Sequence, residues 1–215
     1  MALTAVVIPT LDTPAPLARL LAELPDGVRA YVVDDGSAVP VRAPVHVLRH
    51  ERTRGYGAAQ KTGYRAALDD GAERVVLLHG DGQYDTAQTV ALADALVEAD
   101  GVLGSRLLGP TTAIPPWRLA GNRALTGLAN LRFGARFSDL HTGARAWCAD
   151  TLREVAFDRL SDDFVFDQQI LCAALRAGLR LVERPVASHY GAGSRSIAPL
   201  RAVVYGIGCV REIAR

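Results

Sequence analysis

Apolar runs alternate with helical segments through the first half of the chain, and this alternation limits the possible folds more than any other feature. The apolar runs predict buried strands, and the stretches between them space leucine, valine and alanine as amphipathic helices do. The predicted strands cover Leu3–Pro9, Val28–Val33, Val45–Leu48, residues 74–79 and Gly101–Ser105. The predicted helices cover Pro14–Leu24, Gly55–Leu68 and Thr86–Ala99. Such alternation predicts an α/β fold with a mostly parallel, doubly wound sheet and right-handed crossovers.

The second half of the chain is less regular. We expect helices over Trp117–Phe133, Phe164–Ala177 and Pro199–Arg215, and strands over Ala144–Cys148 and within Gly178–Pro185. No repeat, low-complexity tract or clear linker separates the two halves. A chain of 215 residues suits one large domain, so we predict a single domain with an irregular C-terminal half.

Composition narrows the class of protein and its partners. A hydrophobic fraction of 49% and a charged fraction of 22% are those of an ordinary globular protein, and a net charge of +1 does not recruit nucleic acid. Three widely spaced cysteines form neither a zinc motif nor a disulfide framework, which favours a reducing compartment. The N-terminus lacks a basic segment and runs into a strand, and no apolar stretch approaches the roughly 20 residues of a membrane span. We therefore expect a cytoplasmic protein.

The fourth predicted strand runs directly into a glycine-rich acidic turn over residues 80–85. Asp81 and Asp85 offer carboxylate oxygens with the Gln83 amide between them, and such hard donors suit Mg²⁺ or Mn²⁺. An ion of this kind normally bridges to the phosphates of a nucleotide substrate. The alternative is a structural turn, in which Asp85 or Thr86 caps the next helix.

Two further strand ends carry residues of the same kind. Pro9 closes the first strand, and Asp34 and Asp35 follow the second. Ligands of open α/β sheets bind beyond the carboxyl ends of the strands, so clusters from separate strands predict one shared site with Asp81. Asp34 or Asp35 can accept hydrogen bonds from a base N–H or a ribose hydroxyl, and Asp35 can equally cap the turn that follows it.

Short pieces in a fixed order extend this pattern along nearly the whole chain. They are Val6–Pro9, Val33–Ser37, Arg54–Ala59, Gly80–Asp85, Gly104–Arg106, Asp139 with Thr142-Gly143, Phe166-Asp167 and Glu183–Val186. The ordered set resembles the family 2 glycosyltransferases, and within them the polyprenyl-phosphate (dolichyl-phosphate) mannosyl- and glucosyltransferases. The resemblance implies the nucleotide-diphospho-sugar transferase (GT-A) fold, a nucleotide-sugar donor, a divalent metal (Mg²⁺ or Mn²⁺) and an inverting displacement.

The resemblance also assigns parts of the chain. Residues 1–109 become the nucleotide-sugar-binding half, 110–198 the acceptor half and 199–215 a C-terminal helix. The implied metal ligands are Asp81, Gln83 and His189, although a histidine at a strand end can also be a surface residue. The candidates for donor binding are Pro9, Asp34, Asp35, Arg54, Gly55, Lys61, Asp81 and Arg195. An arginine fork matches phosphate oxygens well, whereas Lys61 and Arg65, four apart on one helix, can instead form a solvated face.

Asp167 matches the position where relatives with hydroxyl acceptors keep the catalytic base. A carboxylate there can take the acceptor's proton; alternatively Asp162, Asp163 and Asp167 merely favour a helix N-terminus. A phosphate acceptor is already ionised and needs no strong base. Asp139, the second catalytic candidate, lines the acceptor side with His141 or only holds its loop.

Several positions depart from the family pattern. His79 stands where the first Asp of the usual Asp-X-Asp lies, Leu11-Asp12-Thr13 replaces Tyr-Asn-Glu, and Gln169 replaces a common Glu. The Gln-X-X-Arg-Trp element of processive synthases is absent, which favours transfer of one sugar. We expect a GDP- or UDP-sugar donor and a polyprenyl phosphate or small hydroxyl acceptor. The alternatives are a non-catalytic nucleotide-sugar-binding module and a sugar-nucleotide nucleotidyltransferase.

The predicted C-terminal helix bears on the membrane question. Val203, Val204, Ile207, Val210 and Ile213 lie near one stripe beside several arginines. Such a stripe permits peripheral contact with the inner face of a membrane, or it packs on the domain.

Overall fold

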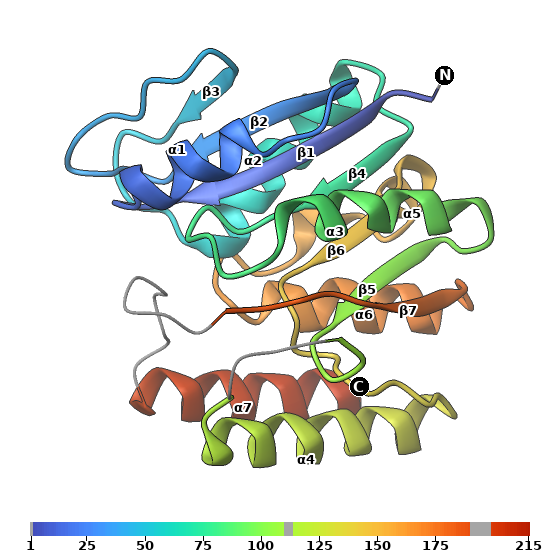
Figure 1. The fold of residues 1–215 in the computed structure, drawn as a ribbon. Helices are drawn as coiled ribbons and strands as arrows, with labels where there is room; N and C mark the ends of the chain where they lie inside the picture. The colour runs from blue at the N-terminus through green and yellow to red at the C-terminus, as the bar shows by residue number, and fades with distance from the viewer. Residues whose placement is uncertain (1, 110–113, 190–198) are drawn as a thin grey trace.

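The computed structural model describes residues 2–109, 114–189 and 199–215. Its sheet has the strand order β3-β2-β1-β4-β6-β5-β7 (Figure 1). The strands are β1 (Thr4–Thr10), β2 (Val28–Asp34), β3 (His46–Arg49), β4 (Arg74–Leu77), β5 (Gly101–Ser105), β6 (Arg145–Cys148) and β7 (Leu181–Pro185). The helices are α1 (Pro14–Ala22), α2 (Tyr56–Asp69), α3 (Thr86–Ala91), α4 (Pro116–Phe133), α5 (Ala149–Glu154), α6 (Phe166–Arg176) and α7 (Pro199–Ala214). Two 3₁₀ segments, η1 (Leu92–Val97) and η2 (Phe157–Arg159), complete the set among the described residues.

The predicted parallel arrangement holds for β3, β2, β1 and β4, and again for β5 with β7. The exception is β6, which runs antiparallel to β4 and to β5. The chain between β5 and β6 leaves and re-enters the sheet at the same edge, because Leu77, the last residue of β4, pairs with Arg145, the first of β6. A strand that enters from the carboxyl edge must run against its neighbours. The loop at 138–143 is thereby placed at the same edge as the acidic turn.

The predicted single helix over Thr86–Ala99 is wrong in its second part. The α-helix ends at Ala91, and the chain continues as the 3₁₀ segment η1. A 3₁₀ winding places residues three apart on the same face. Ala93 and Leu96 are both buried in this way against the sheet.

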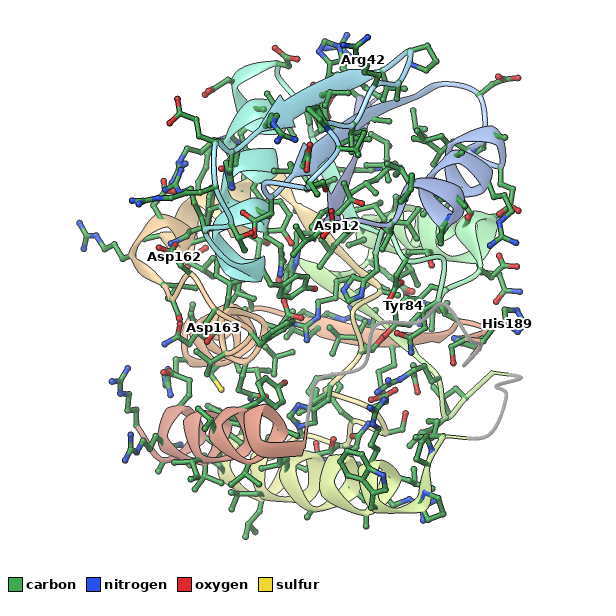
Figure 2. The ribbon with its side chains drawn as sticks, turned by 90° about the vertical axis from the view of Figure 1, so that its left-hand side faces the viewer. Asp12, Arg42, Tyr84, Asp162, Asp163 and His189 are labelled. Atoms are coloured by element: carbon green, nitrogen blue, oxygen red, sulfur yellow. The ribbon has the colours of Figure 1, made fainter. Side chains whose placement is uncertain are left out.

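Helices cover both faces of the sheet, as a doubly wound fold requires. One face packs Val6, Ile8 and Val76 against α1, α3 and η1, and the other packs against α2, α5 and α6. The small residues of α2 let it lie close on the sheet, since a Cβ on Gly63 would overlap Val7. Below these layers, α4 and α7 lie side by side in both views (Figures 1 and 2). Among the described residues, none of the helices has the length and apolarity to cross a membrane.

Candidate active site

The loops that leave β1, β2, β3 and β4 meet at the carboxyl edge with the loop before β6 and the loop before α6. Figure 2 looks onto this edge, with Asp12 near its centre. Tyr84 and His189 lie toward one side and Asp162 and Asp163 toward the other. The edge therefore collects side chains from both halves of the sequence.

Asp34 is fully buried and holds the turn after β2. Its Oδ1 accepts from the Ser37 N–H at 2.8 Å, and its Oδ2 accepts from the Val41 N–H at 3.1 Å and from the Arg49 guanidinium. Burial would raise the pKa of Asp34, but the hydrogen bonds from Ser37, Val41 and Arg49 outweigh it and leave the pKa lowered. The carboxylate thus stays ionised and shapes the loop from inside.

Asp35 organises the loop that leads into α2. Its Oδ1 lies 2.6 Å from Nδ1 of buried His50 and accepts from the Arg54 N–H at 2.9 Å. Its Oδ2 accepts from the Gly55 N–H at 2.9 Å. Gly55 has φ +115°, and a Cβ there would overlap the Asp162 carbonyl oxygen. The predicted donor-side residues Asp35, Arg54 and Gly55 are thereby brought together, with the Arg54 side chain exposed.

Lys61 is buried rather than on a solvated face. Its Nζ donates to the Leu160 carbonyl oxygen at 2.9 Å and lies 2.5 Å from Asp162 Oδ1. Asp163 accepts from the Phe164 N–H at 2.7 Å, in the same loop before α6. Lys61 therefore fastens α2 to the loop before α6. Arg195 lies outside the described residues.

The acidic turn after β4 is tied to β1 and to the segment after β7. The Pro9 carbonyl accepts from the Gly80 N–H at 3.1 Å, and Thr13 Oγ1 donates to the Gly80 carbonyl at 3.1 Å. β1 itself runs one residue beyond Pro9, to Thr10. These bonds fix where the turn projects from the sheet.

Two of the three metal candidates, Asp81 and Gln83, lie in this turn, and the third, His189, is bonded to the turn through its backbone. Asp81 is half-buried, and its Oδ1 accepts from the Gln83 N–H at 3.1 Å. The Gln83 carbonyl accepts from the His189 N–H at 2.8 Å, and the His189 side chain is exposed. Asp85 does not share this arrangement, because its Oδ1 accepts from the Gln88 N–H at 2.8 Å and caps α3. The capping alternative is confirmed for Asp85.

Asp167, in the first turn of α6, lies in a hydrogen-bond network and is 8% exposed. Gln60 Nε2 donates to its Oδ1 at 2.8 Å, and the Tyr56 hydroxyl lies 3.3 Å from its Oδ2. Arg145 is buried in β6 with its guanidinium 3.8 Å from the same Oδ2. Burial is the largest single influence on the pKa of Arg145 and lowers it. The charge of Asp167 and the nearby tyrosines together outweigh burial, so the pKa is raised. The carboxylate is therefore held in one position by three side chains, two from α2 and one from β6.

His79 joins this network. Its Nε2 lies 2.5 Å from the Tyr56 hydroxyl, and its ring packs edge-on against Tyr56 and Tyr84. Burial raises the pKa of Tyr56 well above its ordinary value, and the charge of Asp167 adds to the rise, so the phenol keeps its proton. A Cβ on Gly143 would overlap the His79 imidazole. The residue that replaces the family's first Asp thus points toward the Asp167 side of the site.

Asp139 is fully buried and paired. Arg106 donates from Nε to Oδ2 at 2.7 Å and from a terminal nitrogen to Oδ1 at 2.9 Å, and Asn122 donates to Oδ1 at 2.6 Å. Burial alone would raise the pKa of Asp139, but the hydrogen bonds and charge of Arg106 outweigh it and lower the pKa. The geometry matches the alternative in which Asp139 holds its loop.

His141 lies in the same loop and contacts α7. Its Nδ1 is 2.8 Å from the Tyr205 hydroxyl, and burial lowers the pKa of His141 to about 4, so the imidazole is neutral at pH 7. This contact fastens α7 to the loop at 138–143.

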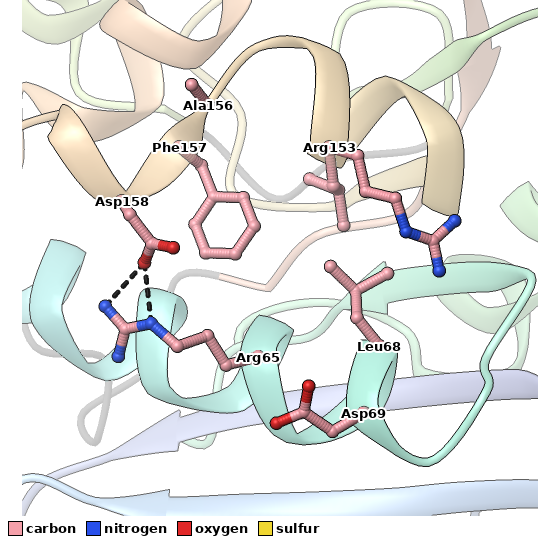
Figure 3. Close-up of a pocket in the computed structure, with 8 residues that line it drawn as sticks. Arg65, Leu68, Asp69, Arg153, Ala156, Phe157 and Asp158 are labelled. Atoms are coloured by element: carbon pink, nitrogen blue, oxygen red, sulfur yellow. Dashed lines mark hydrogen bonds and ion pairs between the residues drawn. The ribbon is translucent and has the colours of Figure 1, made fainter.

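Two cavities lie near these elements. One, of about 660 Å³, separates α1 from the loop at 37–44 and opens beside Asp12. The other, of about 440 Å³, lies between α2 and the α5–η2 segment (Figure 3). Arg65 lines the second cavity and pairs there with Asp158 at 2.5 Å. Arg65 is therefore engaged away from the acidic turn.

Sequence reasoning missed the supporting residues His50, Tyr56, Gln60, Asn122 and Arg145. A signal existed for two of them, because Tyr56 and Gln60 are four apart on α2 and share a face with Tyr64, whose hydroxyl donates to Gln60 at 2.8 Å. For the others, the partner comes from a distant segment and leaves no local pattern.

The mostly parallel sheet, with loops from both halves of the sequence meeting at its carboxyl edge, is that of the GT-A fold. The family model described as glycosyl transferase family 2 matches residues 5–118, and the chain belongs to this family. The expected fold, family and enzyme class are thereby confirmed.

Relatives and solved structures agree with this assignment. The chain is 31% identical over 196 residues to an undecaprenyl-phosphate mannosyltransferase of Micrococcus luteus, covering 84% of this chain and 81% of the relative. It is 25% identical over 204 residues to a dolichyl-phosphate hexose transferase of Haloferax volcanii, covering 91% and 86%. The fold matches Mycobacterium tuberculosis glucosyl-3-phosphoglycerate synthase in complex with UDP, with a TM-score of 0.71, 14% identity and coverage of 99% and 80%. The same synthase with Mn²⁺, UDP-glucose and phosphoglyceric acid gives a TM-score of 0.70 at 18% identity, covering 99% and 78%.

Proposed function

We propose that this glycosyltransferase moves one hexose, with inversion, from a GDP- or UDP-sugar to a polyprenyl phosphate. A small hydroxyl compound is the second acceptor class. The observation that carries the proposal is the 31% identity to an undecaprenyl-phosphate mannosyltransferase along most of both chains. The fold neighbours bound to UDP support a nucleotide-diphosphate donor.

On the donor side, Asp35 holds the loop that carries Arg54 and Gly55 at the carboxyl edge of the sheet, against Asp162. The Asp35 carboxylate accepts hydrogen bonds from the backbone N–H groups of Arg54 and Gly55, so the conformation of the loop depends on this carboxylate. The exposed Arg54 guanidinium is then available to the diphosphate, which an arginine fork binds through two oxygens. Asp34, with no exposed surface, contributes by shaping its loop.

The donor set fits a metal that is shared with the substrate. In the described part of the chain, no three His, Cys, Asp or Glu side chains gather closely enough to enclose an ion. Mg²⁺ typically takes one or two carboxylates together with substrate phosphates and water, so Asp81, Gln83 and His189 suffice as protein ligands. When bound, Mg²⁺ or Mn²⁺ supplies positive charge that stabilises the departing nucleotide diphosphate.

On the acceptor side, the role of Asp167 depends on the nucleophile. A hydroxyl acceptor must lose a proton as it attacks the anomeric carbon, and the Asp167 carboxylate takes that proton as general base. A polyprenyl phosphate is already an anion. In that case Asp167 is not needed for proton transfer.

Asp167→Asn therefore separates the acceptor classes. With a hydroxyl acceptor, we expect the loss of a general base to lower kcat by roughly 10²–10⁴-fold. With a polyprenyl phosphate, kcat falls far less. The measurement is the turnover rate of wild type and Asp167→Asn with each acceptor and the same labelled sugar nucleotide.

The two other functions that the sequence left open are disfavoured by the comparisons. A nucleotide-sugar-binding module without catalysis is suggested by His79 in place of an aspartate, but the chain belongs to a glycosyltransferase family and its relatives are named as transferases. A sugar-nucleotide nucleotidyltransferase shares a similar open sheet, but the segment after β1 lacks the glycine-rich basic loop that an incoming triphosphate needs. Titration calorimetry with GDP and UDP, with and without Mn²⁺, tests binding. Turnover of labelled GDP-mannose or UDP-glucose with a polyprenyl phosphate then tests transfer.

Asp81→Asn is the decisive variant for the metal. We expect the Mn²⁺-dependent affinity for the nucleotide to fall by roughly 10–100-fold, the loss found when even a supporting group of a metal site is removed. Asp85→Asn is the matched control, because asparagine also caps helices well. Equal nucleotide affinity and turnover in wild type and Asp81→Asn would refute the metal role of Asp81.

A further inference from the structure

The exposed apolar side chains of this protein are concentrated on two helices. Among the described residues, ten large hydrophobic side chains are exposed, and seven of them lie on α4 and α7. The seven are Trp117, Leu128, Leu131, Val203, Val204, Ile207 and Val210. On α7 they recur at 203, 204, 207 and 210, which is one face of a helix. The predicted stripe therefore faces solvent, apart from Ile213, which is buried.

The same two segments are strongly basic. Residues 114–138 contain four arginines and no acidic residue, and residues 199–215 contain three arginines and one glutamate. Their net charge is +6, so the other residues together carry −5 within the overall +1. The single glutamate, Glu212, is 5% exposed and pairs with Arg176 at 2.6 Å and with Arg215 at 3.1 Å. No exposed carboxylate on α4 or α7 offsets the other arginines.

The inner side of this layer is attached to the acceptor half. Tyr205 of α7 is bonded to His141, and Asn122 of α4 donates to Asp139. Ala129 and Ile213 pack in the cluster beneath the two helices. The exposed faces of α4 and α7 are thus the outer side of a layer whose inner side supports the acceptor loop.

We propose that α4 and α7 dock the enzyme on an anionic bilayer surface. This deepens the proposed function and rests on it, since a polyprenyl phosphate resides in a bilayer. An apolar helix face flanked by arginines matches the boundary between acyl chains and anionic headgroups. A second copy of the chain fits less well, because two faces of the same strong positive charge repel each other.

Tryptophan fluorescence provides a direct measurement. The chain has two tryptophans, of which Trp117 on α4 is 54% exposed and Trp147 in β6 is fully buried. Adding phosphatidylcholine vesicles that contain phosphatidylglycerol should shift the Trp117 emission to the blue. The shift should weaken with added salt, because exposed charges are then screened. Vesicles of phosphatidylcholine alone should bind more weakly.

Val204→Glu should lower vesicle affinity about tenfold, because a charge replaces an apolar side chain at the interface. Val97→Glu is the matched control, since Val97 is equally an exposed valine but lies on η1, and its affinity should equal that of the wild type. Equal binding by Val204→Glu and wild type would overturn the proposal. So would a lipid-free dimer that Val204→Glu dissociates in analytical ultracentrifugation.

Turnover separates this proposal from the proposed function. With a polyprenyl phosphate embedded in vesicles, Val204→Glu should be slower than Val97→Glu, and with a short water-soluble polyprenyl phosphate the two should be equal. If the wild type turns over neither acceptor but still binds anionic vesicles, the proposed function fails and the docking surface stands. If Val204→Glu turns over the embedded acceptor as fast as the wild type, the docking surface fails alone.

Discussion

Replacing Asp139 with alanine tests whether this carboxylate serves the fold or the reaction. Asp139 is fully buried, and Arg106, its partner, is 8% exposed. Arg106 donates to both carboxylate oxygens and Asn122 donates to one of them. Removing one partner of a buried ion pair leaves an uncompensated charge and costs about 3–5 kcal/mol of unfolding free energy.

For a chain of this length, each kcal/mol shifts Tm by about 2–4 °C, so Asp139→Ala should lower Tm by about 6–20 °C. Urea unfolding followed by circular dichroism measures the free energy directly. Asp150→Ala is the matched control, because Asp150 is 96% exposed in its pair with Arg153 and an exposed pair is worth about 0–1 kcal/mol. If Asp139→Ala keeps wild-type stability while turnover is lost, Asp139 is catalytic and the structural role is refuted.

The same carboxylate predicts how stability depends on pH. The folded-state pKa of Asp139 is lowered, so its contribution is fully present above the unfolded pKa of about 3.9. The contribution is lost as the pH falls below that value and through the folded pKa. Asp139→Ala should therefore show a weaker loss of stability between neutral and acid pH than the wild type. Identical pH profiles would contradict the lowered pKa.

Three further predictions concern the network around α2. Gly143→Ala should lower the free energy of unfolding by about 1–3 kcal/mol, measured in urea, because the added methyl group overlaps the His79 ring. Gly55→Ala should weaken nucleotide binding in calorimetry and lower Tm, since φ at this residue is +115° and its Cβ would meet a backbone carbonyl. Tyr56→Phe should lower the free energy of unfolding by about 0.5–1.5 kcal/mol, as the bonds to His79 and Asp167 are lost, while nucleotide affinity stays unchanged.

Much of the fold could be predicted from the sequence because its signals are local. Buried strands such as Thr4–Thr10 are built around a continuous apolar run, here Ala5–Pro9, and parallel strands place their carboxyl ends at one edge. That rule alone is enough to predict that the loops of Asp35 and Asp81 lie at the same edge of the sheet. The direction of β6 has no such local signal, because it depends on where the chain between β5 and β6 re-enters the sheet.

The roles of charged side chains were harder to predict for a physical reason. An aspartate that binds a substrate and one that is neutralised inside the protein look alike in a sequence, and only the partner distinguishes them. Asp139 meets Arg106 from a segment more than thirty residues away, and Lys61 meets Asp162 across the site. Such pairings are set by tertiary packing, so the sequence could indicate where the site lies but not which charges were already satisfied.

His79 illustrates how one substitution changes two parts of a site. In the sequence, a histidine in place of the first aspartate of Asp-X-Asp indicates either that a metal ligand is lost or that a nitrogen ligand replaces a carboxylate oxygen. In the structure its Nε2 is bonded to Tyr56, which also contacts Asp167, so the side chain is part of the hydrogen-bond network of Asp167. The proposed metal then depends on Asp81, Gln83 and His189 and on the substrate's phosphates, with one aspartate in place of two. A site of that kind binds its metal tightly only together with the nucleotide, which couples metal and donor binding more strongly than two aspartates would.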